Sequence, residues 1–314
     1  MSNFFYQCTP FQTGLFAIFI FSVLSMASLS SCTDTEKEKS SYEFDLQGHR
    51  GARGLLPENT ISSFLKAAEL GVDTIELDLV VSGDSQLVVS HEPWFNHKIS
   101  TKPDGSPVTE NEAKELNIFQ MTAEEIQKFD VGKRGNPDFP DQKPVKAHKP
   151  LFREAIRQIE QFVSEHNLEP VSYNIETKSN PEYYSIMVPE PDTFAQLLYD
   201  DLQSLGITSR SVVQSFDVNT LKAMREIDPD VSLALLVENR EPVEENLNRL
   251  GFTPDIYSPY YKNLNRSMIE NVHAAGMKLI PWTINDISEM RSYLEMGVDG
   301  IITDYPDRAL ELKK

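Results

Sequence analysis

The sequence contains little cysteine and no apolar run long enough to cross a bilayer. Cys8 and Cys32 are the only cysteines among 314 residues, and both lie close to the N-terminus. The longest apolar stretch, residues 14–29, is shorter than the roughly 20 residues that a membrane-spanning helix requires. A stretch of this length is typical of the apolar core of a signal peptide.

Basic residues are absent from positions 1–31, although a signal peptide usually begins with a positively charged segment. The apolar stretch nevertheless ends in Leu29-Ser30-Ser31-Cys32, which resembles a bacterial lipobox. We therefore expect residues 1–31 to be a lipoprotein signal peptide and Cys32 to be the lipidated first residue of the mature chain. Removal of Cys8 would leave no disulfide. A short uncleaved anchor remains the alternative.

Such an anchor implies a place in the cell envelope of a bacterium, attached to the membrane and facing the periplasm or the cell surface. The residues that follow, TDTEKEKSS at 33–41, are polar and without apolar periodicity. We expect residues 32–41 to form a flexible tether and residues 42–314 to form the folded domain.

Acidic residues outnumber basic ones by 48 to 29, which gives a formal net charge of −19. A field of this sign repels the phosphates of a polynucleotide, so a nucleic-acid partner is excluded. A small anionic substrate remains compatible with it, because a bound cation and a nearby arginine can invert the local field.

From residue 44 onward, strand-like and helix-like patterns alternate along the chain. Helical spacing appears at 59–70, 218–227, 266–275 and 287–295. The expected strands are 44–48, 74–81, 86–90, 171–176, 211–215, 231–237, 255–258, 278–282 and 300–303. If 74–90 is a hairpin that counts as one position, eight βα steps result, and they predict an α/β fold of the (β/α)8 TIM-barrel class. A doubly wound sheet is the alternative.

The segment of about 92–150 interrupts this alternation. It is rich in Pro, Asn, Asp and Lys and has no clean strand pattern. A stretch of this length is usually a functional insertion or a small subdomain. We expect a small insertion after the second strand and its hairpin.

Acidic side chains and a histidine follow or occupy the strands whose carboxyl ends would meet at one face of a barrel. Glu76 and Asp78 are two residues apart in one strand and therefore share a face. If the hairpin turns at 82–85, His91 lies opposite Glu76 on that face, and Glu176 supplies a third carboxylate from the next strand.

Buried carboxylates this close together destabilise the fold by several kcal/mol unless a cation compensates them. Three oxygen ligands with open positions suit Mg²⁺ or Ca²⁺ better than Zn²⁺. We therefore expect a divalent metal cofactor, Ca²⁺ or Mg²⁺. The alternative is an outward-facing charged strand face, although the neighbours Ile75, Leu77 and Leu79 are apolar.

A set of short motifs resembles the glycerophosphodiester phosphodiesterase family, which belongs to the phospholipase C-like barrel superfamily. The motifs occur in family order and cover residues 44–308. They are His49-Arg50-Gly51, Pro57-Glu58-Asn59-Thr60, Glu76-Leu77-Asp78, Val88-Val89-Ser90-His91, Asn174-Ile175-Glu176-Thr177-Lys178, Gln214-Ser215-Phe216, Pro281-Trp282-Thr283-Ile284-Asn285 and Asp299-Gly300-Ile301-Ile302-Thr303-Asp304-Tyr305-Pro306.

The resemblance implies a role for each matching residue. His49 and His91 correspond to the general base and acid, and Arg50 to the residue that binds the phosphate. Lys178 matches a lysine of the site and Trp282 a wall of the substrate pocket. Glu76, Asp78 and Glu176 correspond to the metal ligands. Glu58 is similar to a residue near the metal or its water, and we expect it to contribute to substrate binding.

One residue departs from the family pattern. Glu92 follows the second histidine, where the family usually has Asp. If this carboxylate touches the metal or orients His91, the longer side chain could change the geometry or the metal preference.

Three functions are consistent with these residues. The leading hypothesis is metal-dependent hydrolysis of a small-molecule glycerophosphodiester to glycerol 3-phosphate and an alcohol. A second is a lipid head-group phosphodiesterase of the same superfamily, which a more extended apolar lip around the site would favour. A third is a non-catalytic lipoprotein that captures phosphodiesters, which loss of a histidine or a metal ligand would indicate.

Overall fold

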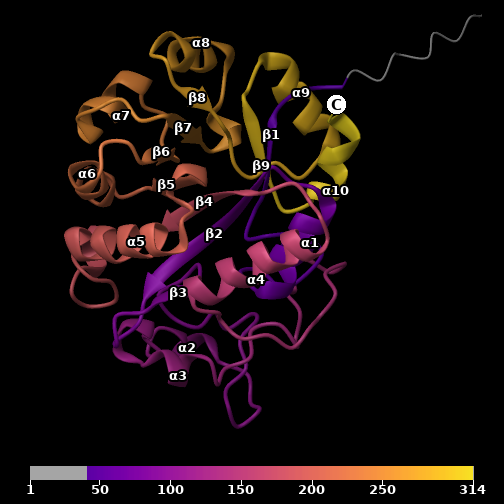
Figure 1. The fold of residues 1–314 in the computed structure, drawn as a ribbon, viewed down its shortest axis with the longest axis vertical. Coiled ribbons are helices and arrows are strands. Elements are labelled where there is room, and N and C mark those ends of the chain that lie inside the picture. The colour runs from indigo at the N-terminus through magenta and orange to yellow at the C-terminus, as the bar shows by residue number, and fades with distance from the viewer. Residues whose placement is uncertain (1–40, 314) are drawn as a thin grey trace, which may run out of the picture. The chain divides into compact units, whose positions relative to one another are not determined.

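Eight parallel strands form the wall of a barrel (Figure 1). A computed structural model describes residues 41–313, so the expected signal peptide, Cys32 and nearly all of the expected tether lie outside the described residues. The strands are β1 (Asp45–Gly48), β2 (Thr74–Val81), β3 (Leu87–Val89), β4 (Ser172–Thr177), β5 (Ser211–Ser215), β6 (Ser232–Val237), β7 (Ile256–Pro259), β8 (Lys278–Leu279) and β9 (Gly300–Thr303).

The strand order is β8-β7-β6-β5-β4-β2-β1-β9, and β3 pairs antiparallel with β2 outside this path. Backbone hydrogen bonds join the two ends of the order: the Asp299 N–H donates to the Leu279 carbonyl at 2.9 Å, and the Ile302 N–H donates to the Pro281 carbonyl at 3.1 Å. The predicted (β/α)8 barrel is confirmed. A doubly wound sheet is wrong, because such a sheet would keep two unpaired edges.

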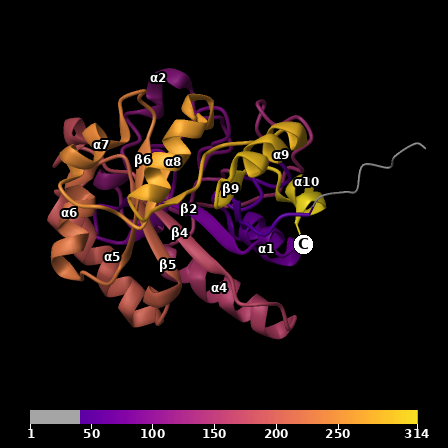
Figure 2. The same cartoon turned by 90° about the horizontal axis from the view of Figure 1, so that it is seen from above.

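Helices surround the strands, as Figure 2 shows from above. The longer helices are α1 (Ile61–Leu70), α4 (Phe152–Glu165), α5 (Pro191–Leu205), α6 (Val218–Ile227), α7 (Val243–Leu250), α8 (Arg266–Ala274) and α9 (Ile287–Met296), followed by the single turn α10 (Pro306–Ala309). Single 3₁₀ turns occur at Pro181–Tyr183, Thr208–Arg210, Tyr261–Asn263 and Leu310–Leu312. Between residues 41 and 313, no helix is long and apolar enough to cross a membrane.

The two faces of the barrel wall have different compositions. Outward-facing residues such as Leu77, Ile175 and Leu235 are buried in the main apolar core beneath the helices. The inward-facing residues divide into a polar half on β1, β2, β4 and β5 and an apolar half on β6–β9. Members of the polar half are Gln47, Glu76, Asp78, Asn174, Glu176 and Gln214, and members of the apolar half are Ala234, Ile256, Ile280 and Ile302. Charged chemistry is therefore restricted to one side of the interior.

The segment between β3 and α4 contains only the short helices α2 (Glu110–Ala113) and α3 (Ala123–Ile126) and a 3₁₀ turn at Ile118–Gln120. It lies below β3 in Figure 1. Its apolar side chains form a small core of their own against the hairpin, in which the rings of Phe95 and Phe129 stack with centroids 4.0 Å apart.

The expected register of the hairpin is wrong by one residue. Leu87, and not Gln86, lies opposite Val81, and the ladder continues to the pair Leu79 and Val89. The turn contains one more residue than we expected, because the Ser82 N–H donates to the Gln86 carbonyl. Extrapolated along the strands, this register sets His91 opposite Leu77. His91 therefore reaches the site because the chain leaves the ladder after Val89.

Three aspartates at the amino ends of β2, β7 and β9 connect each of these strands to a neighbour. Asp299 donates its N–H to the Leu279 carbonyl, and its carboxylate accepts the Leu279 N–H at 2.7 Å. Asp73 does the same with Leu46, and Asp255 with Leu233, each with a 2.8 Å bond to the carboxylate. Each pair of bonds fixes the relative height of two adjacent strands at the end of the barrel away from the strand carboxyl ends.

We expect Asp299→Ala to lower the free energy of unfolding by about 1–3 kcal/mol, because the Leu279 N–H loses its acceptor. Asp299→Asn keeps an acceptor oxygen and should recover part of the loss. Chemical denaturation monitored by circular dichroism measures the effect. The exposed Asp141 is the control, and Asp141→Ala should change stability by less than about 0.5 kcal/mol. Equal effects of Asp299→Ala and Asp141→Ala would contradict this role.

Candidate active site

A cavity of about 430 Å³ opens at the carboxyl ends of the strands. Its size is within the range of small-molecule sites. Among the residues that line it are His49, Arg50, Glu76, His91, Glu176, Lys178 and Trp282. The barrel thus brings together residues from both ends of the folded domain.

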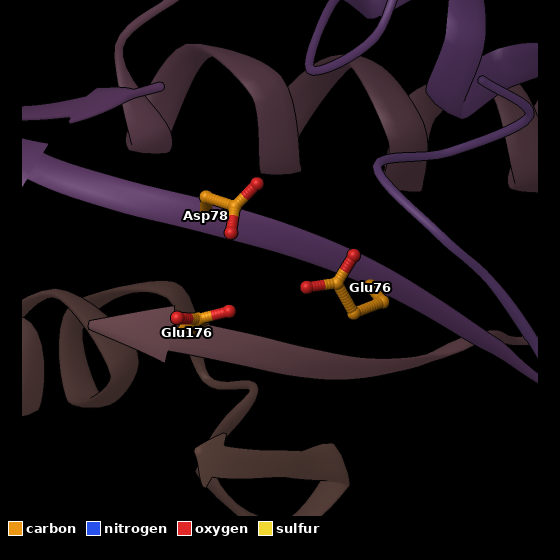
Figure 3. A group of neighbouring side chains, drawn as sticks. All are labelled: Glu76, Asp78 and Glu176. Atoms are coloured by element: carbon orange, nitrogen blue, oxygen red, sulfur yellow. The ribbon is translucent and has the colours of Figure 1, made fainter. Parts of the chain in front are cut away.

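The three predicted metal ligands converge at this cavity, which Glu76 and Glu176 line. Glu76 and Asp78 project from β2 toward Glu176 on β4, as Figure 3 shows. Asp78 and Glu176 are direct neighbours in the parallel register. One carboxylate oxygen from each of the three residues lies within 4.8 Å of the others, and all three side chains are buried.

The electrostatics of this group differ from residue to residue. Burial, together with the charge of Asp78, raises the pKa of Glu176 to about 7, although Lys178 opposes the shift. Burial and the charges of Asp78 and Glu176 also raise the pKa of Glu76. Burial also favours the neutral form of Asp78. The charges of Arg50, His91 and Lys178 outweigh burial, however, and lower the Asp78 pKa. Without a further cation, the three carboxylates do not all favour ionisation.

The triad fits a divalent cation. The Oδ1 atom of Asp78 is buried and accepts no hydrogen bond from any residue that the structure describes. An orphaned carboxylate oxygen in such a position is costly, and coordination of a hard cation would satisfy it. The donor set contains only oxygen atoms, which suits Mg²⁺ or Ca²⁺.

Arg50 lies beside the triad. Its backbone has a left-handed conformation with φ of 50°, and its N–H donates to the Glu76 carboxylate at 2.7 Å. Its guanidinium donates to Glu58 at 2.7 Å and approaches Asp78 at 3.3 Å. These bonds to carboxylates fix the positively charged guanidinium of Arg50 at the cavity wall.

Glu58 is not among the residues that line the cavity. It is buried behind two guanidinium groups, at 2.7 Å from Arg50 and 2.9 Å from Arg53. Both arginines outweigh the effect of burial and lower the Glu58 pKa. In this structure Glu58 orients the arginines, and its expected role near the metal or the substrate stays a prediction.

His49 follows β1, and its ring pairs with a carboxylate from the other end of the chain. The distance from His49 Nδ1 to Asp304 Oδ1 is 2.7 Å, and the side chain of Asn285 donates to the other oxygen of Asp304 at 2.7 Å. Burial lowers the pKa of the imidazole. Burial opposes ionisation of Asp304, but His49 and Arg53 lower the Asp304 pKa to about 2. An ionised partner on Nδ1 leaves Nε2 as the unprotonated nitrogen.

His91 has the same arrangement with a neighbour in sequence. Its Nδ1 lies 3.0 Å from Glu92 Oε1, which also accepts from the Asn96 side chain at 3.3 Å. Although burial favours the neutral acid, the hydrogen bond and charge of His91 lower the pKa of Glu92 to about 2. Burial and the positive charges of Arg50 and Lys178 lower the His91 pKa. Glu92, the departure from the family pattern, thus orients the histidine.

Lys178 and Trp282 complete the set that the motifs indicate. The Lys178 ammonium donates to Glu176 at 2.6 Å and lies 3.8 Å from Asp78. Trp282 stands on the apolar side of the barrel, where its indole N–H donates to the Ser258 carbonyl at 2.9 Å. Both side chains line the cavity.

Three further residues take part in the site. Arg53 lines the cavity, Gln214 donates to Glu76 at 3.0 Å, and Asp304 pairs with His49. Gln214 and Asp304 stand in two of the motifs that resemble the family, but the sequence alone indicated no role for either residue. A polar residue directly after or inside a barrel strand was the signal that could have identified both.

The chain is similar to proteins of one family over most of its length. The model of the glycerophosphoryl diester phosphodiesterase family matches residues 49–308. A glycerophosphodiester phosphodiesterase of Bacillus subtilis is 30% identical over 85% of each chain. One from Caldanaerobacter subterraneus is 27% identical over 84% of this chain and 95% of the relative.

The fold is also similar to those of solved phosphodiesterase structures. The structure of an Oleispira antarctica phosphodiesterase in complex with its product sn-glycerol-3-phosphate superimposes with a TM-score of 0.68 at 21% identity, over 85% of this chain and 96% of the other. A glycerophosphodiester phosphodiesterase from Parabacteroides distasonis gives 0.62 at 21% identity, over 86% and 98%. With the family match extending from the first site histidine to beyond the last strand, this protein belongs to the glycerophosphoryl diester phosphodiesterase family.

Proposed function

We propose that the protein hydrolyses glycerophosphodiesters to glycerol 3-phosphate and an alcohol. The observation that carries the proposal is the buried triad of Glu76, Asp78 and Glu176 at the base of a cavity that also contains two carboxylate-paired histidines. The relatives that match most of the chain include glycerophosphodiester phosphodiesterases at 27% and 30% identity, and a structural relative holds sn-glycerol-3-phosphate.

Glu76, Asp78 and Glu176 would hold a divalent cation, Ca²⁺ or Mg²⁺. Such an ion polarises a phosphoryl oxygen and offsets the negative charge that develops there. Arg50 and Lys178 supply fixed positive charge at the same wall of the cavity. Together they bind and orient the phosphate of a diester, whose single negative charge the rest of this acidic protein would repel.

The two histidines would move protons on either side of the phosphate. Asp304 accepts a hydrogen bond from the Nδ1–H group of His49, so the free Nε2 can remove a proton from the attacking hydroxyl. Glu92 orients His91 in the same way, and a protonated His91 can donate to the leaving oxygen. We assign His49 as base and His91 as acid, as the family resemblance implies. Burial favours the neutral form of His49, and its partner Asp304 fixes the remaining proton on Nδ1, so that Nε2 can act as the base.

Other functions receive less support. A lipid head-group phosphodiesterase would need an apolar lip around the cavity, but Ile186 and Phe216 are the only exposed large hydrophobic residues in the part of the chain that the structure describes. A non-catalytic binding protein would have no need for both histidines, and here each histidine is paired with its own carboxylate.

We also propose that the enzyme is a lipoprotein anchored to a bacterial membrane through Cys32. The Leu29-Ser30-Ser31-Cys32 box and the apolar stretch before it support this location. The polar residues 33–41 would then separate the barrel from the bilayer by a short tether.

We expect the activity to depend on a divalent metal. EDTA should abolish release of product from glycerophosphocholine, and Ca²⁺ or Mg²⁺ should restore it. Because the pKa of Glu176 is raised to about 7, the metal-free protein gains stability from this group below about pH 4.5 and loses it as the pH rises through 7. Metal binding displaces the proton, so added metal should raise the melting temperature more at pH 8 than at pH 5.5.

Thermal unfolding followed by circular dichroism, with and without metal, measures this difference. Glu176→Gln removes the titrating group and should abolish both the metal-induced shift and most of the activity. Full activity after exhaustive chelation would remove the metal from the mechanism.

We expect the two histidines to act as a pair in catalysis. His49→Ala and His91→Ala should each lower kcat by roughly 10²–10⁴-fold, the usual contribution of a positioned acid or base. The fold and the metal-induced stabilisation should persist. The double variant should be little slower than the slower single variant, because the two residues act as a unit. His166→Ala, at the exposed C-terminal end of α4, is the matched control and should keep wild-type kcat.

A substrate with a nitrophenol leaving group separates the two roles, because a good leaving group needs no protonation. It should restore the rate of His91→Ala and leave His49→Ala slow. Near-normal kcat on glycerophosphocholine for either single variant would rule out the paired mechanism.

We expect the chain to be anchored through Cys32. Produced in a bacterium, the full chain should fractionate with membranes and carry a diacylated or triacylated Cys32 at its N-terminus, as mass spectrometry can establish. Cys32→Ser should prevent lipidation, whereas Cys8→Ser, which lies in the segment to be removed, should not affect it. An intact N-terminus at Met1 would contradict the proposed processing.

A further inference from the structure

A buried lysine lies close to the site, and neither the two histidines nor the metal ligands account for it. Lys149 is 5% exposed. It belongs to the stretch in which the chain returns from the segment between β3 and α4. There the Val89 N–H donates to the Pro150 carbonyl at 2.9 Å, and Val88 and Leu151 form an isolated antiparallel bridge. This pairing fixes the backbone of Lys149 beside the end of β3.

The Lys149 ammonium has one hydrogen-bond acceptor. Its Nζ donates to Ser90 Oγ at 2.6 Å and forms no ion pair within the part of the chain that the structure describes. The centroid of the Phe95 ring lies 5.3 Å from it. Burial lowers the pKa of Lys149, although the charge of Glu92 and of other carboxylates opposes the shift. A buried charge in these surroundings destabilises the fold relative to an apolar side chain of similar length, so packing does not explain the lysine.

One hydroxyl connects Lys149 to the residues on both sides of His91. An ammonium can only donate, so the Ser90 hydroxyl accepts from Lys149 and keeps its own proton for another acceptor. That acceptor is the main-chain carbonyl of Glu92, at 2.6 Å. Ser90 and Glu92 flank His91, and the carboxylate of Glu92 lies 3.0 Å from His91 Nδ1. The lysine therefore directs the bond that closes this turn.

The turn has little other support. The Ser90 N–H donates to the Asp78 carbonyl at 2.9 Å, but among the described residues no hydrogen bond between backbone groups involves His91 or Glu92. The Asn96 side chain donates to the carboxylate of Glu92 and not to its main chain. Of the groups that the structure describes, the Ser90 hydroxyl is therefore the one that restrains the main chain between His91 and its carboxylate partner.

We propose that Lys149 is a positioning residue for the proton donor: it holds the Ser90 hydroxyl so that His91 and Glu92 keep the orientation that protonates the leaving oxygen. Lys149 is not among the residues that line the cavity, so it acts without touching the substrate. The ammonium sets the direction of the Ser90 hydroxyl, which an apolar side chain could not do. The inference rests on the proposed function and deepens it.

The test measures kcat and KM of the metal-loaded enzyme for glycerophosphocholine and for a glycerophosphodiester with a nitrophenol leaving group, which needs no protonation. Lys149→Met removes the charge and keeps the length of the side chain. It should lower kcat for glycerophosphocholine by roughly 10- to 100-fold at unchanged KM, because misplacing a catalytic group by about 1 Å can cost this much. The nitrophenyl ester should react at close to the wild-type rate. The melting temperature should equal or exceed that of the wild type, because a buried charge is lost.

Lys146→Met is the matched control, because Lys146 is exposed in the same segment and should affect neither rate. Ser90→Ala removes the connecting hydroxyl and should repeat the contrast between the two esters, which keeps the test readable if Lys149→Met fails to fold. In the His91→Ala background, Lys149→Met should add no further loss. Equal losses with both esters, as damage to the metal site would produce, or no loss with either, would overturn the inference.

Two further comparisons separate this inference from the proposed function. If His91→Ala shows the contrast between the esters and Lys149→Met does not, the proposed mechanism stands and the inference fails. NMR of the histidine ring nitrogens in isotope-labelled protein gives a readout without turnover: Lys149→Met should shift the signals of His91 and not those of His49. Unchanged His91 signals would contradict the positioning. A shift at His91 in a protein that is inactive on both esters would refute the proposed hydrolysis and leave the positioning intact.

Discussion

The burial of three carboxylates on one side of the barrel is the constraint on which the rest of the site depends. Glu76, Asp78 and Glu176 lie too close together and too far from water to be ionised without compensation. Arg50, Lys178, Asn59 and Gln214 each donate to or approach one of them. Most of the polar interior of the barrel thus serves to stabilise this group.

The same constraint accounts for the division of the interior into two halves. The donors must come from β1, β2, β4 and β5 or from the segments that follow them, because only these strands border the triad. The strands β6–β9 are free of this requirement and fill the interior with Ala234, Ile256, Ile280 and Ile302. An anion-binding end and an apolar end of one cavity result from a single electrostatic requirement.

Most of the fold and much of the site could be predicted from the sequence because the signals are local. Runs of strand-forming residues bounded by polar residues indicated the eight βα steps of the barrel. Glu76 and Asp78, two residues apart in one strand, indicated the carboxylate triad. The hairpin register could not be predicted, because a turn with one extra residue changes every pairing after it. The strand expected at 278–282 is also shorter in the structure, where β8 ends at Leu279. Beyond Leu279, only an isolated bridge joins Trp282 to Tyr260. The pairing of His49 with Asp304 could not be predicted either, because the two residues are 255 positions apart in the chain.

That separation has a consequence for biosynthesis. His49 stands at the end of the first strand, whereas the carboxylate that orients it follows the last strand, which pairs with the first. His91, by contrast, finds its carboxylate in the next residue. One of the two histidine–carboxylate pairs is therefore complete as soon as its loop forms, and the other only when the barrel is whole. A nascent chain still emerging from the ribosome, or one cut short before β9, would have the strands that carry the carboxylate triad but would lack the partner that orients His49. This pair has to wait until the last strand is in place.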